Sequence, residues 1–246
     1  MIPAYDANSH PLIRKLESTF DLSEEERQAI LSLPVTVHDI KADEDIVHDE
    51  DRPSQCCLIL KGSAFRYKTF EGGRRQIFSF HIAGDITDLQ SLQLSVMDHS
   101  VATLERSRVA FITHQDLQTL MLAFPRIGGA FWRDTLIDAA VFRLWMANIG
   151  RKDAYGRIAH LLCEMFLRMK AVGLTNEKSF FMPITQTEIA DALGLSGIHV
   201  NRTLQDLRAV GLITIRKRCV TVEDWDGLQK AGEFHPTYLH FRKHAA

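Results

Sequence analysis

The segment 185–213, which reads TQTEIADALGLSGIHVNRTLQDLRAVGLI, constrains this chain more than any other part of its sequence. Thr185, followed three residues later by Glu188, forms a capping box, so a helix is expected to begin there. Gly194 supplies the left-handed residue that ends this helix, and Ser196 offers the N-cap of a second one. Two short helices joined by so tight a turn predict a helix-turn-helix, a motif that places its second helix against DNA.

The second helix of this pair is expected to keep one face free. Val200, Leu204 and Leu207 supply its packing face. The outer face is then formed by Ser196, Gly197, His199, Arg202 and Asp206. In a major groove, Arg202 can donate to both acceptors of a guanine. Phosphate contacts are expected from polar residues at the two helix N-termini, namely Thr185, Gln186 and Ser196. The alternative is that a capped helical hairpin serves only as scaffold.

Two short runs follow the helices and enclose a basic turn. Residues 212–215 and 219–222 alternate like the strands of a β-hairpin, or wing. Its turn consists of three cations, Arg216, Lys217 and Arg218. Such clusters are often only solvated surface, but these lie where a phosphate backbone would run. Residues 151–246 carry 14 Lys and Arg against 10 Asp and Glu, a net charge of +4 in a chain whose total is −2, which favours a DNA-binding role for this part.

The N-terminal half has the pattern of an antiparallel β-domain. After a helix expected at 23–32, which Ser23 would cap, the sequence changes to short runs of β-forming residues separated by turns. These runs are 35–38, 57–60, 64–67, 76–80 and 108–112. They predict an α+β fold with an N-terminal β-roll or jelly-roll. We expect three parts: a sensor-like β-roll in 1–126, a dimerisation helix in 127–152 and a winged helix-turn-helix domain in 153–246.

A long helix is expected after Pro125, and it carries two apolar faces. One face repeats at spacings of three and four residues, as the seam of a two-stranded coiled coil does. Its members are Trp132, Thr135, Ala139, Phe142, Met146 and Ile149. The other face would cover the β-roll and contains Leu136, Ile137, Val141, Leu144 and Trp145. If the first face also only covered the β-roll, no partner would be needed, but two faces favour a homodimer. Asp153 is expected to cap the following helix, 154–172.

Cysteine and histidine spacing gives no sign of a metal centre. The four cysteines form no CxxC pair and suit a reducing cytoplasm. Cys56 and Cys57 would point to opposite faces of one strand, so at least one is expected in the core. No cofactor and no metal are predicted, although haem stays open through five isolated histidines, His38, His48, His81, His99 and His114. Without a signal peptide or a long apolar run, we expect a cytoplasmic protein with no membrane partner.

The order of β-roll, long helix and winged helix-turn-helix resembles the Crp/Fnr family of bacterial transcription regulators. Gly84-Asp85 is similar to a corner of that family's β-roll, and 156–159 to the start of its hinge-following helix. Residues 185–202 resemble its DNA-binding signature, with Arg202 on the guanine-reading arginine. The resemblance implies a homodimer on a palindromic site in double-stranded DNA. It also implies contact with RNA polymerase if the protein is an activator.

The chain departs from the family's cyclic-AMP pocket at each of three motifs. The positions that replace them are the candidate effector residues, Asp88, Leu89, His99, Ser100, Phe142 and Arg143. Between His81 and Glu105 there is no Arg or Lys, so a buried phosphate would have no cationic partner apart from a protonated His99. An effector pocket that is degenerate or specific for another ligand is therefore expected. The family's iron-sulfur cluster is excluded because no cysteine precedes Cys56.

The recognition helix departs from the family as well. Gly197 and Ile198 stand where polar or charged base readers are common, so a different half-site is expected. Most of the direct readout is assigned to four residues, His199, Val200, Asn201 and Arg202. Two other classes were weighed: a cupin-like metalloenzyme lacks the His-x-His it needs, and a cyclic-nucleotide-binding regulatory protein without DNA lacks a phosphate arginine. The sequence thus predicts a regulator and no enzyme.

Overall fold

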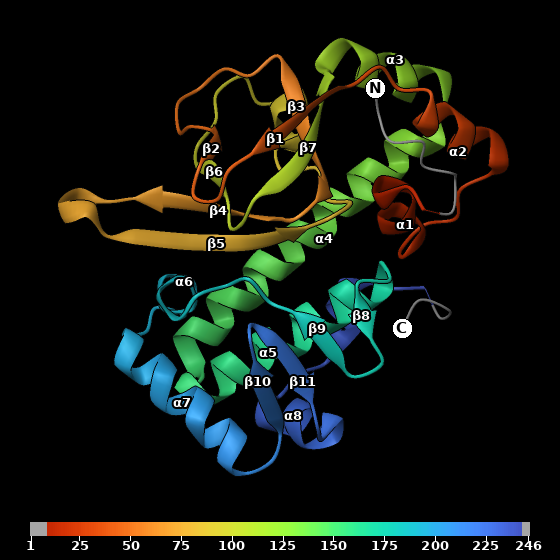
Figure 1. The fold of residues 1–246 in the computed structure, drawn as a ribbon. Coiled ribbons are helices and arrows are strands. Elements are labelled where there is room, and N and C mark those ends of the chain that lie inside the picture. Colours follow the sequence, from red (N-terminus) through yellow and green to blue (C-terminus); the bar gives the residue numbers. More distant parts are fainter. Residues whose placement is uncertain (1–8, 243–246) are drawn as a thin grey trace.

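Residues 9–242 are described by the structure, a computed structural model, in which a β-roll and a helical domain lie on either side of one long helix (Figure 1). The β-roll consists of two antiparallel sheets with the strand orders β1-β7-β3 and β2-β6-β4-β5. Their strands are β1 (Thr36–Ile40), β2 (Asp45–Val47), β3 (Gln55–Lys61), β4 (Ser63–Thr69), β5 (Arg75–Ile82), β6 (Ser100–Thr103) and β7 (Ser107–Thr113). The α+β fold with an N-terminal β-roll is confirmed. The short strands β2 and β6 were missed, because neither alternates between apolar and polar residues.

Strand β3 is buried along its centre because both of its faces are covered. Leu58 and Leu60 pack with the N-terminal helices, whereas Ile59 packs with Val47 and Val101 of the opposite sheet. The period of two along a strand explains this division. The covering helices are α1 (Pro11–Glu17), α2 (Glu24–Leu31) and α3 (His114–Ala123), and Ser23 caps α2 with the expected capping box.

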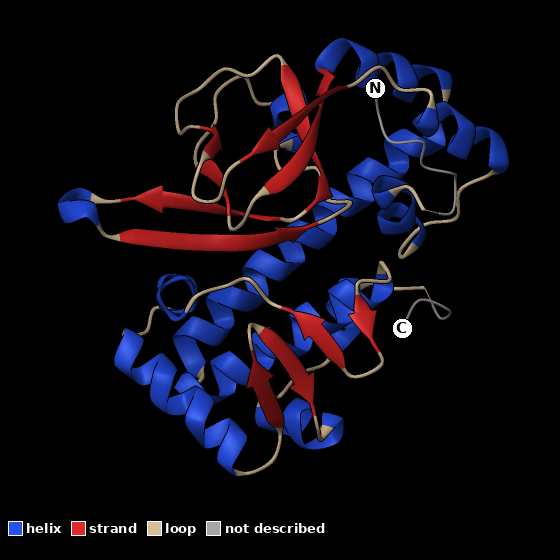
Figure 2. Ribbon diagram, in the orientation of Figure 1, coloured by secondary structure: helices blue, strands red, loops and turns tan. Residues whose placement is uncertain are grey.

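Helix α4 (Pro125–Arg151) crosses the molecule behind the two halves (Figure 2). The side chains of Ile137, Val141 and Trp145, on the covering face of α4, are buried as expected. Leu136 was assigned to that face, but its side chain is 49% exposed. The assignment was wrong because Leu136 follows Trp132 by four residues and so shares its face of the helix.

The C-terminal domain is built around helix α5 (Ala154–Ala171), which is buried over most of its length. Asp153 caps α5 through the amide of Gly156, as expected. Helices α6 (Gln186–Leu193), α7 (Gly197–Ala209) and α8 (Trp225–Ala231) pack on α5 with a sheet of order β10-β11-β9-β8. The strands of that sheet are β8 (Thr175–Asn176), β9 (Ser179–Phe181), β10 (Ile213–Arg216) and β11 (Cys219–Val222). Short 3-10 turns lie at Glu71–Gly73, Leu89–Leu92 and Pro236–Leu239.

The long β4-β5 hairpin reaches across to the helix-turn-helix. The guanidinium of Arg75 lies 2.9 Å from the carboxylate of Asp191 in α6, and the Gln76 amide donates to the Ala192 carbonyl at 3.2 Å. Phe65 and Ile77 of the hairpin belong to the same hydrophobic cluster as the core of the C-terminal domain. The β-roll and the C-terminal domain are therefore packed together, although the sequence places them in separate domains.

Candidate nucleic-acid interface

Helix α6 begins at the capping box read from the sequence. The Thr185 hydroxyl accepts from the Glu188 amide at 3.3 Å, and the Glu188 carboxylate accepts from the Thr185 amide at 2.6 Å. Gly194 ends the helix with a φ of 64°, in the left-handed region that a side chain disfavours. Thr185 and Gln186 are exposed at this N-terminus. The turn after Gly194 then redirects the chain into α7.

Helix α7 presents the face that the sequence assigned to DNA. Ser196 caps it by accepting from the His199 amide at 3.3 Å. The residues expected on the outer face are all exposed, namely Ser196, Gly197, His199, Arg202 and Asp206. Val200, Leu204 and Leu207 are buried, which confirms their prediction as the packing face; the further assignment of Val200 to base readout was wrong. The side chain of Val200 packs α7 against the core, so it is not available to contact a base.

Asn201 is held by amides on either side of it. Its Nδ2 donates to Oε1 of Gln186 at 3.1 Å, and its Oδ1 accepts from Nε2 of Gln205 at 3.0 Å. One donor hydrogen and one lone pair of the Asn201 amide stay free for a base edge. Asn201 and Gln205 are four residues apart, so their contact along the helix can be predicted from the sequence. The hydrogen bond from Asn201 to Gln186 depends on the angle between α7 and α6. Residue spacing within one helix does not predict that angle.

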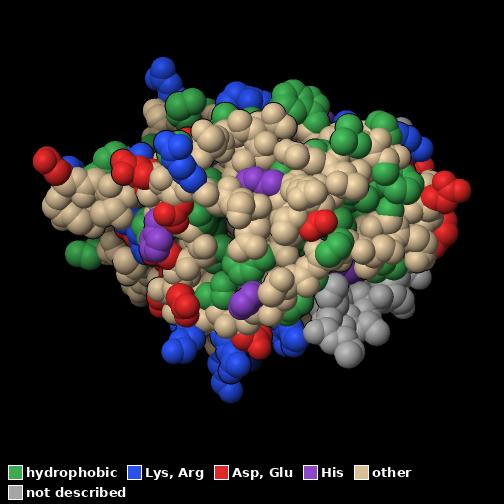
Figure 3. All heavy atoms as spheres, turned by 90° about the horizontal axis from the view of Figure 1, so that it is seen from above, with side chains coloured by type: hydrophobic (Ala, Val, Ile, Leu, Met, Phe, Trp, Pro, Cys, Tyr) green, Lys and Arg blue, Asp and Glu red, His purple; other side chains and the backbone are tan. Residues whose placement is uncertain are grey.

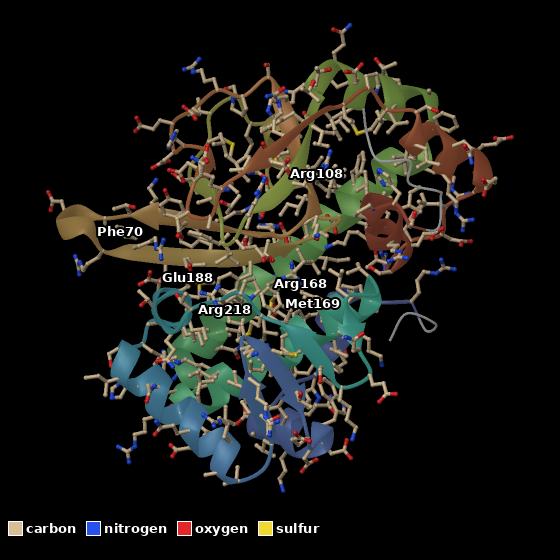
Figure 4. The ribbon with its side chains drawn as sticks, viewed as in Figure 1. Phe70, Arg108, Arg168, Met169, Glu188 and Arg218 are labelled. Carbon is tan, nitrogen blue, oxygen red and sulfur yellow. The ribbon has the colours of Figure 1, made fainter. Side chains whose placement is uncertain are left out.

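The basic turn of the wing lies beside the start of α6. Lys217 and Arg218 adopt φ values of 49° and 65°, which closes a tight turn between β10 and β11. The three cations Arg216, Lys217 and Arg218 are exposed. The Met182 amide donates to the Arg218 carbonyl at 2.8 Å, three residues before Thr185. Figure 4 accordingly places Arg218 near Glu188, so the cations and the N-terminus of α6 share one side of the domain.

The hinge between α4 and α5 also holds the helix-turn-helix. Arg157 donates to the Lys152 carbonyl at 2.8 Å and to the Leu193 carbonyl at 2.9 Å. One guanidinium thus connects the hinge to the last residue of α6.

A cavity of about 580 Å³ lies between β5, the loop before β6 and helix α4. Of the candidate effector residues, His99 and Phe142 line it. The others lie elsewhere: Asp88 accepts from the Cys57 amide at 2.7 Å, Ser100 accepts from the Asp49 amide, Leu89 packs near the N-terminal helices and Arg143 is exposed. Five of the six seam residues, Thr135, Ala139, Phe142, Met146 and Ile149, also line the cavity.

Arg66 supplies a cation to this cavity, contrary to the expectation that none would be present. It enters from β4, outside the interval between His81 and Glu105, which contains no Arg or Lys. Its guanidinium lies 2.6 Å from the carboxylate of Asp138 and donates to the Thr87 carbonyl at 2.8 Å. Burial and the charge of Arg66 lower the pKa of His99, so a protonated His99 is disfavoured. The cavity therefore holds a cation whose charge Asp138 already neutralises.

Both adjacent cysteines of β3 are buried. Burial raises the pKa of the Cys56 thiol to about 12 and raises that of Cys57 well above its usual value. The expectation that at least one lies in the core is confirmed. Among residues 9–242, no three His, Cys, Asp or Glu side chains are grouped so that they would hold a metal ion.

The surface at the β-roll end carries acidic and basic side chains interspersed with one another (Figure 3). In the described part of the chain, no helix combines the length and the apolar character needed to cross a membrane.

Two sequence families match the chain. Residues 37–124 match the cyclic nucleotide-binding domain, and residues 156–231 match the Crp-like helix-turn-helix domain. Among curated relatives, the transcriptional activator protein FnrL of Cereibacter sphaeroides is 29% identical over 198 residues, 78% of this chain and 79% of its own length. The fumarate and nitrate reduction regulatory protein of Shigella dysenteriae is 23% identical over 221 residues, 89% of this chain and 88% of its own.

Solved structures share the fold. FixK2 from Bradyrhizobium japonicum superposes with a TM-score of 0.73 at 23% identity, covering 81% of this chain and 98% of that one. The c-di-GMP responsive global regulator CLP of Xanthomonas campestris gives a TM-score of 0.62 at 15% identity, covering 82% of this chain and 100% of that one.

Proposed function

Because the chain belongs to the Crp/Fnr family of transcription regulators and carries its helix-turn-helix DNA-binding domain, we propose that it acts as a homodimer on a palindromic DNA site. The observation that carries this proposal is the exposed, capped helix α7, with Arg202 on its outer face and the basic turn beside it. Two such helices, about one turn of DNA apart, would enter successive major grooves. The protein would be a cytoplasmic regulator without catalytic activity.

The homodimer proposal rests on the unpartnered seam of α4. Trp132 is 66% exposed and Met146 is 71% exposed, although both are large apolar side chains. They repeat with Thr135, Ala139 and Phe142 at coiled-coil spacing. A second copy of α4 would cover this face and close the mouth of the cavity at the same time.

The cavity is the proposed effector site, and its ligand is proposed to differ from cyclic AMP. The match to the cyclic nucleotide-binding domain favours the alternative of a cyclic nucleotide, and so does Arg66, since a guanidinium can bind a phosphate. Its pairing with Asp138 argues against this, because a phosphate would have to compete with a carboxylate already in place. A ligand that preferred one arrangement of α4 and the hinge would shift the population of DNA-competent dimers. The names of the relatives favour activation, which requires contact with RNA polymerase.

Substitution of Arg202 tests the DNA-binding assignment. Sites selected from a random duplex library should contain a guanine in each half-site. Arg202→Ala should weaken binding to them by about 1–3 kcal/mol and relax the preference at that guanine. The matched control is Arg208→Ala, an exposed arginine in the last turn of the same helix, which should leave the preference intact. Equal affinity and equal preference in Arg202→Ala and the wild type would refute the readout assignment.

A further inference from the structure

Ile198 is an apolar side chain that the fold leaves in water. It stands at the second position of α7 and is 81% exposed. None of the hydrophobic clusters of the described residues includes it. A single exposed apolar residue is ordinary on a protein surface. Ile198 differs because it lies on the face of α7 that also carries Arg202, where a partner with polar base edges is expected.

Gly197, immediately before Ile198, has no role in the packing of the chain. A Cβ built at Gly197 would meet no atom within 4 Å apart from its chain neighbours and the backbone of its own helix, and its φ is not in the left-handed region. Neither space nor backbone conformation therefore requires glycine at the start of this helix. What glycine provides is a backbone that can approach another surface closely. Its neighbour Ile198 would then reach deeper than it could from a helix held away by a side chain.

The placement of Ile198 relative to Arg202 limits where it would touch DNA. The two residues are four apart, which is about 6 Å along a helix axis. Bases are stacked about 3.4 Å apart and the recognition helix lies inclined to the DNA axis in the groove, so the contact of Ile198 falls within about two base pairs of the guanine of Arg202. The kind of base group that Ile198 can contact is also restricted. A branched alkyl group can neither donate to nor accept from a base edge, and the apolar group that the major groove displays is the methyl of thymine.

We propose that Ile198 is a specificity-determining residue that reads the 5-methyl group of a thymine within about two base pairs of the guanine bound by Arg202. The inference rests on the proposed DNA-binding function. Asn201, three residues after Ile198, is hydrogen-bonded to Gln186 and Gln205. The contact of Ile198 distinguishes the thymine from cytosine, which lacks a methyl group at that position of the groove.

Replacement of thymine by deoxyuridine tests this contact because it removes only the methyl group. Sites are first selected with the full-length protein, and each thymine of one half-site is then replaced in turn. Dissociation constants are measured at one salt concentration for the wild type, Ile198→Ala and Val210→Ala. Val210 is the control, since it is 63% exposed and apolar at the far end of the same helix. Melting temperatures of all three proteins should agree, because both side chains are exposed.

We expect the replacement of thymine by deoxyuridine to weaken binding at one position of the half-site only. There the wild type and Val210→Ala should bind the uracil site about fourfold more weakly, the factor for one buried methyl group. Ile198→Ala should bind the thymine site more weakly and not distinguish the two. Tolerance of uracil at every position by the wild type, or an unchanged loss in Ile198→Ala, would overturn the inference while leaving DNA binding intact. If no sequence is selected at all, the proposed function itself fails.

Discussion

The carboxylate of Asp85 shows how a single residue can join separate elements of this molecule. Lys15 of α1 lies 2.7 Å from it and Arg168 of α5 lies 3.0 Å from it. Burial alone would raise the pKa of Asp85, but these cations hold it well below its usual range. Gly84 makes the approach feasible, since its φ is +100° and a Cβ there would lie 2.5 Å from the Pro11 carbonyl. Figure 4 shows Arg168 between the two halves.

Loss of Arg168 should therefore be costly. Arg168→Met would leave the buried carboxylates of Asp85 and Glu164 without one of their partners, and we expect a loss of about 3–5 kcal/mol in the free energy of unfolding. Urea denaturation at neutral pH measures this. The control Arg27→Met removes an ion pair at the surface and should cost much less. Similar losses in both variants would show that Arg168 is not a buried electrostatic link.

Helix α4 has one buried face and one face that is exposed in the single chain. Val141 and Trp145 are buried against the rest of the chain, while Trp132 and Met146 lie open. A period of 3.6 residues assigns each side chain to one face, so one helix can serve the core and a partner together. The indole of Trp145 also donates to the Glu164 carboxylate at 3.1 Å, which links α4 to α5.

A charge placed on the open face of α4 should separate the dimer. Met146→Glu would bury two carboxylates at the proposed seam, weakening association by on the order of 3 kcal/mol, about a hundredfold. Sedimentation over a range of concentrations should then show monomers that remain folded, and their melting temperature should no longer depend on protein concentration. Leu122→Glu is the control, since Leu122 is 83% exposed on α3, outside the seam. Dimers of unchanged stability in Met146→Glu would contradict the seam.

The whole molecule is held together by polar contacts that join both ends of the chain. The Tyr238 hydroxyl donates to the Glu164 carboxylate at 2.7 Å, and the Arg242 amide donates to the Ser18 carbonyl at 2.8 Å. The C-terminal segment thus fastens the DNA-binding domain to the N-terminal helices. Burial lowers the pKa of His81 and of His160 to about 4, so the folded state keeps both neutral.

Stability should fall in mild acid for this reason. Each of the two histidines takes up a proton near pH 6.5 in the unfolded chain but only near pH 4 in the folded one. Below pH 6.5 protonation therefore favours the unfolded chain, and the stability that each neutral histidine contributes is lost as the pH falls from about 6.5 to 4. At pH 5 the loss is about 2 kcal/mol for each of His81 and His160. Asp88 acts in the opposite sense: burial raises its pKa to about 6, so its contribution is lost as the pH rises from about 4 to 6.

Comparison with one variant isolates the histidine contribution. Unfolding free energies of the wild type and His160→Gln, measured from pH 5 to 7, should differ in slope, because the variant takes up about one proton less on unfolding. The contribution of Asp88 is common to both proteins and cancels. Parallel curves would mean that His160 is not held neutral by burial.

The sequence by itself determined the features that depend on neighbours along the chain. The capping box at Thr185, the left-handed Gly194 and the long helix after Pro125 were all predicted correctly. Each is encoded within one or two turns of the chain, because caps and periodicity need only residues three or four apart. For the same reason the exposed face of α7 was anticipated, apart from Val200.

Only the tertiary structure decided which distant residues meet. Arg66 and Asp138 are 72 positions apart, and their pairing depends on how β4 lies against α4. The cation in the cavity was therefore not predicted, and two of the expected effector residues, Asp88 and Arg143, do not line this cavity. The bond between Asn201 and Gln186 likewise follows from the angle between two helices. Such contacts depend on the path of the whole chain, which no local spacing of residue types records.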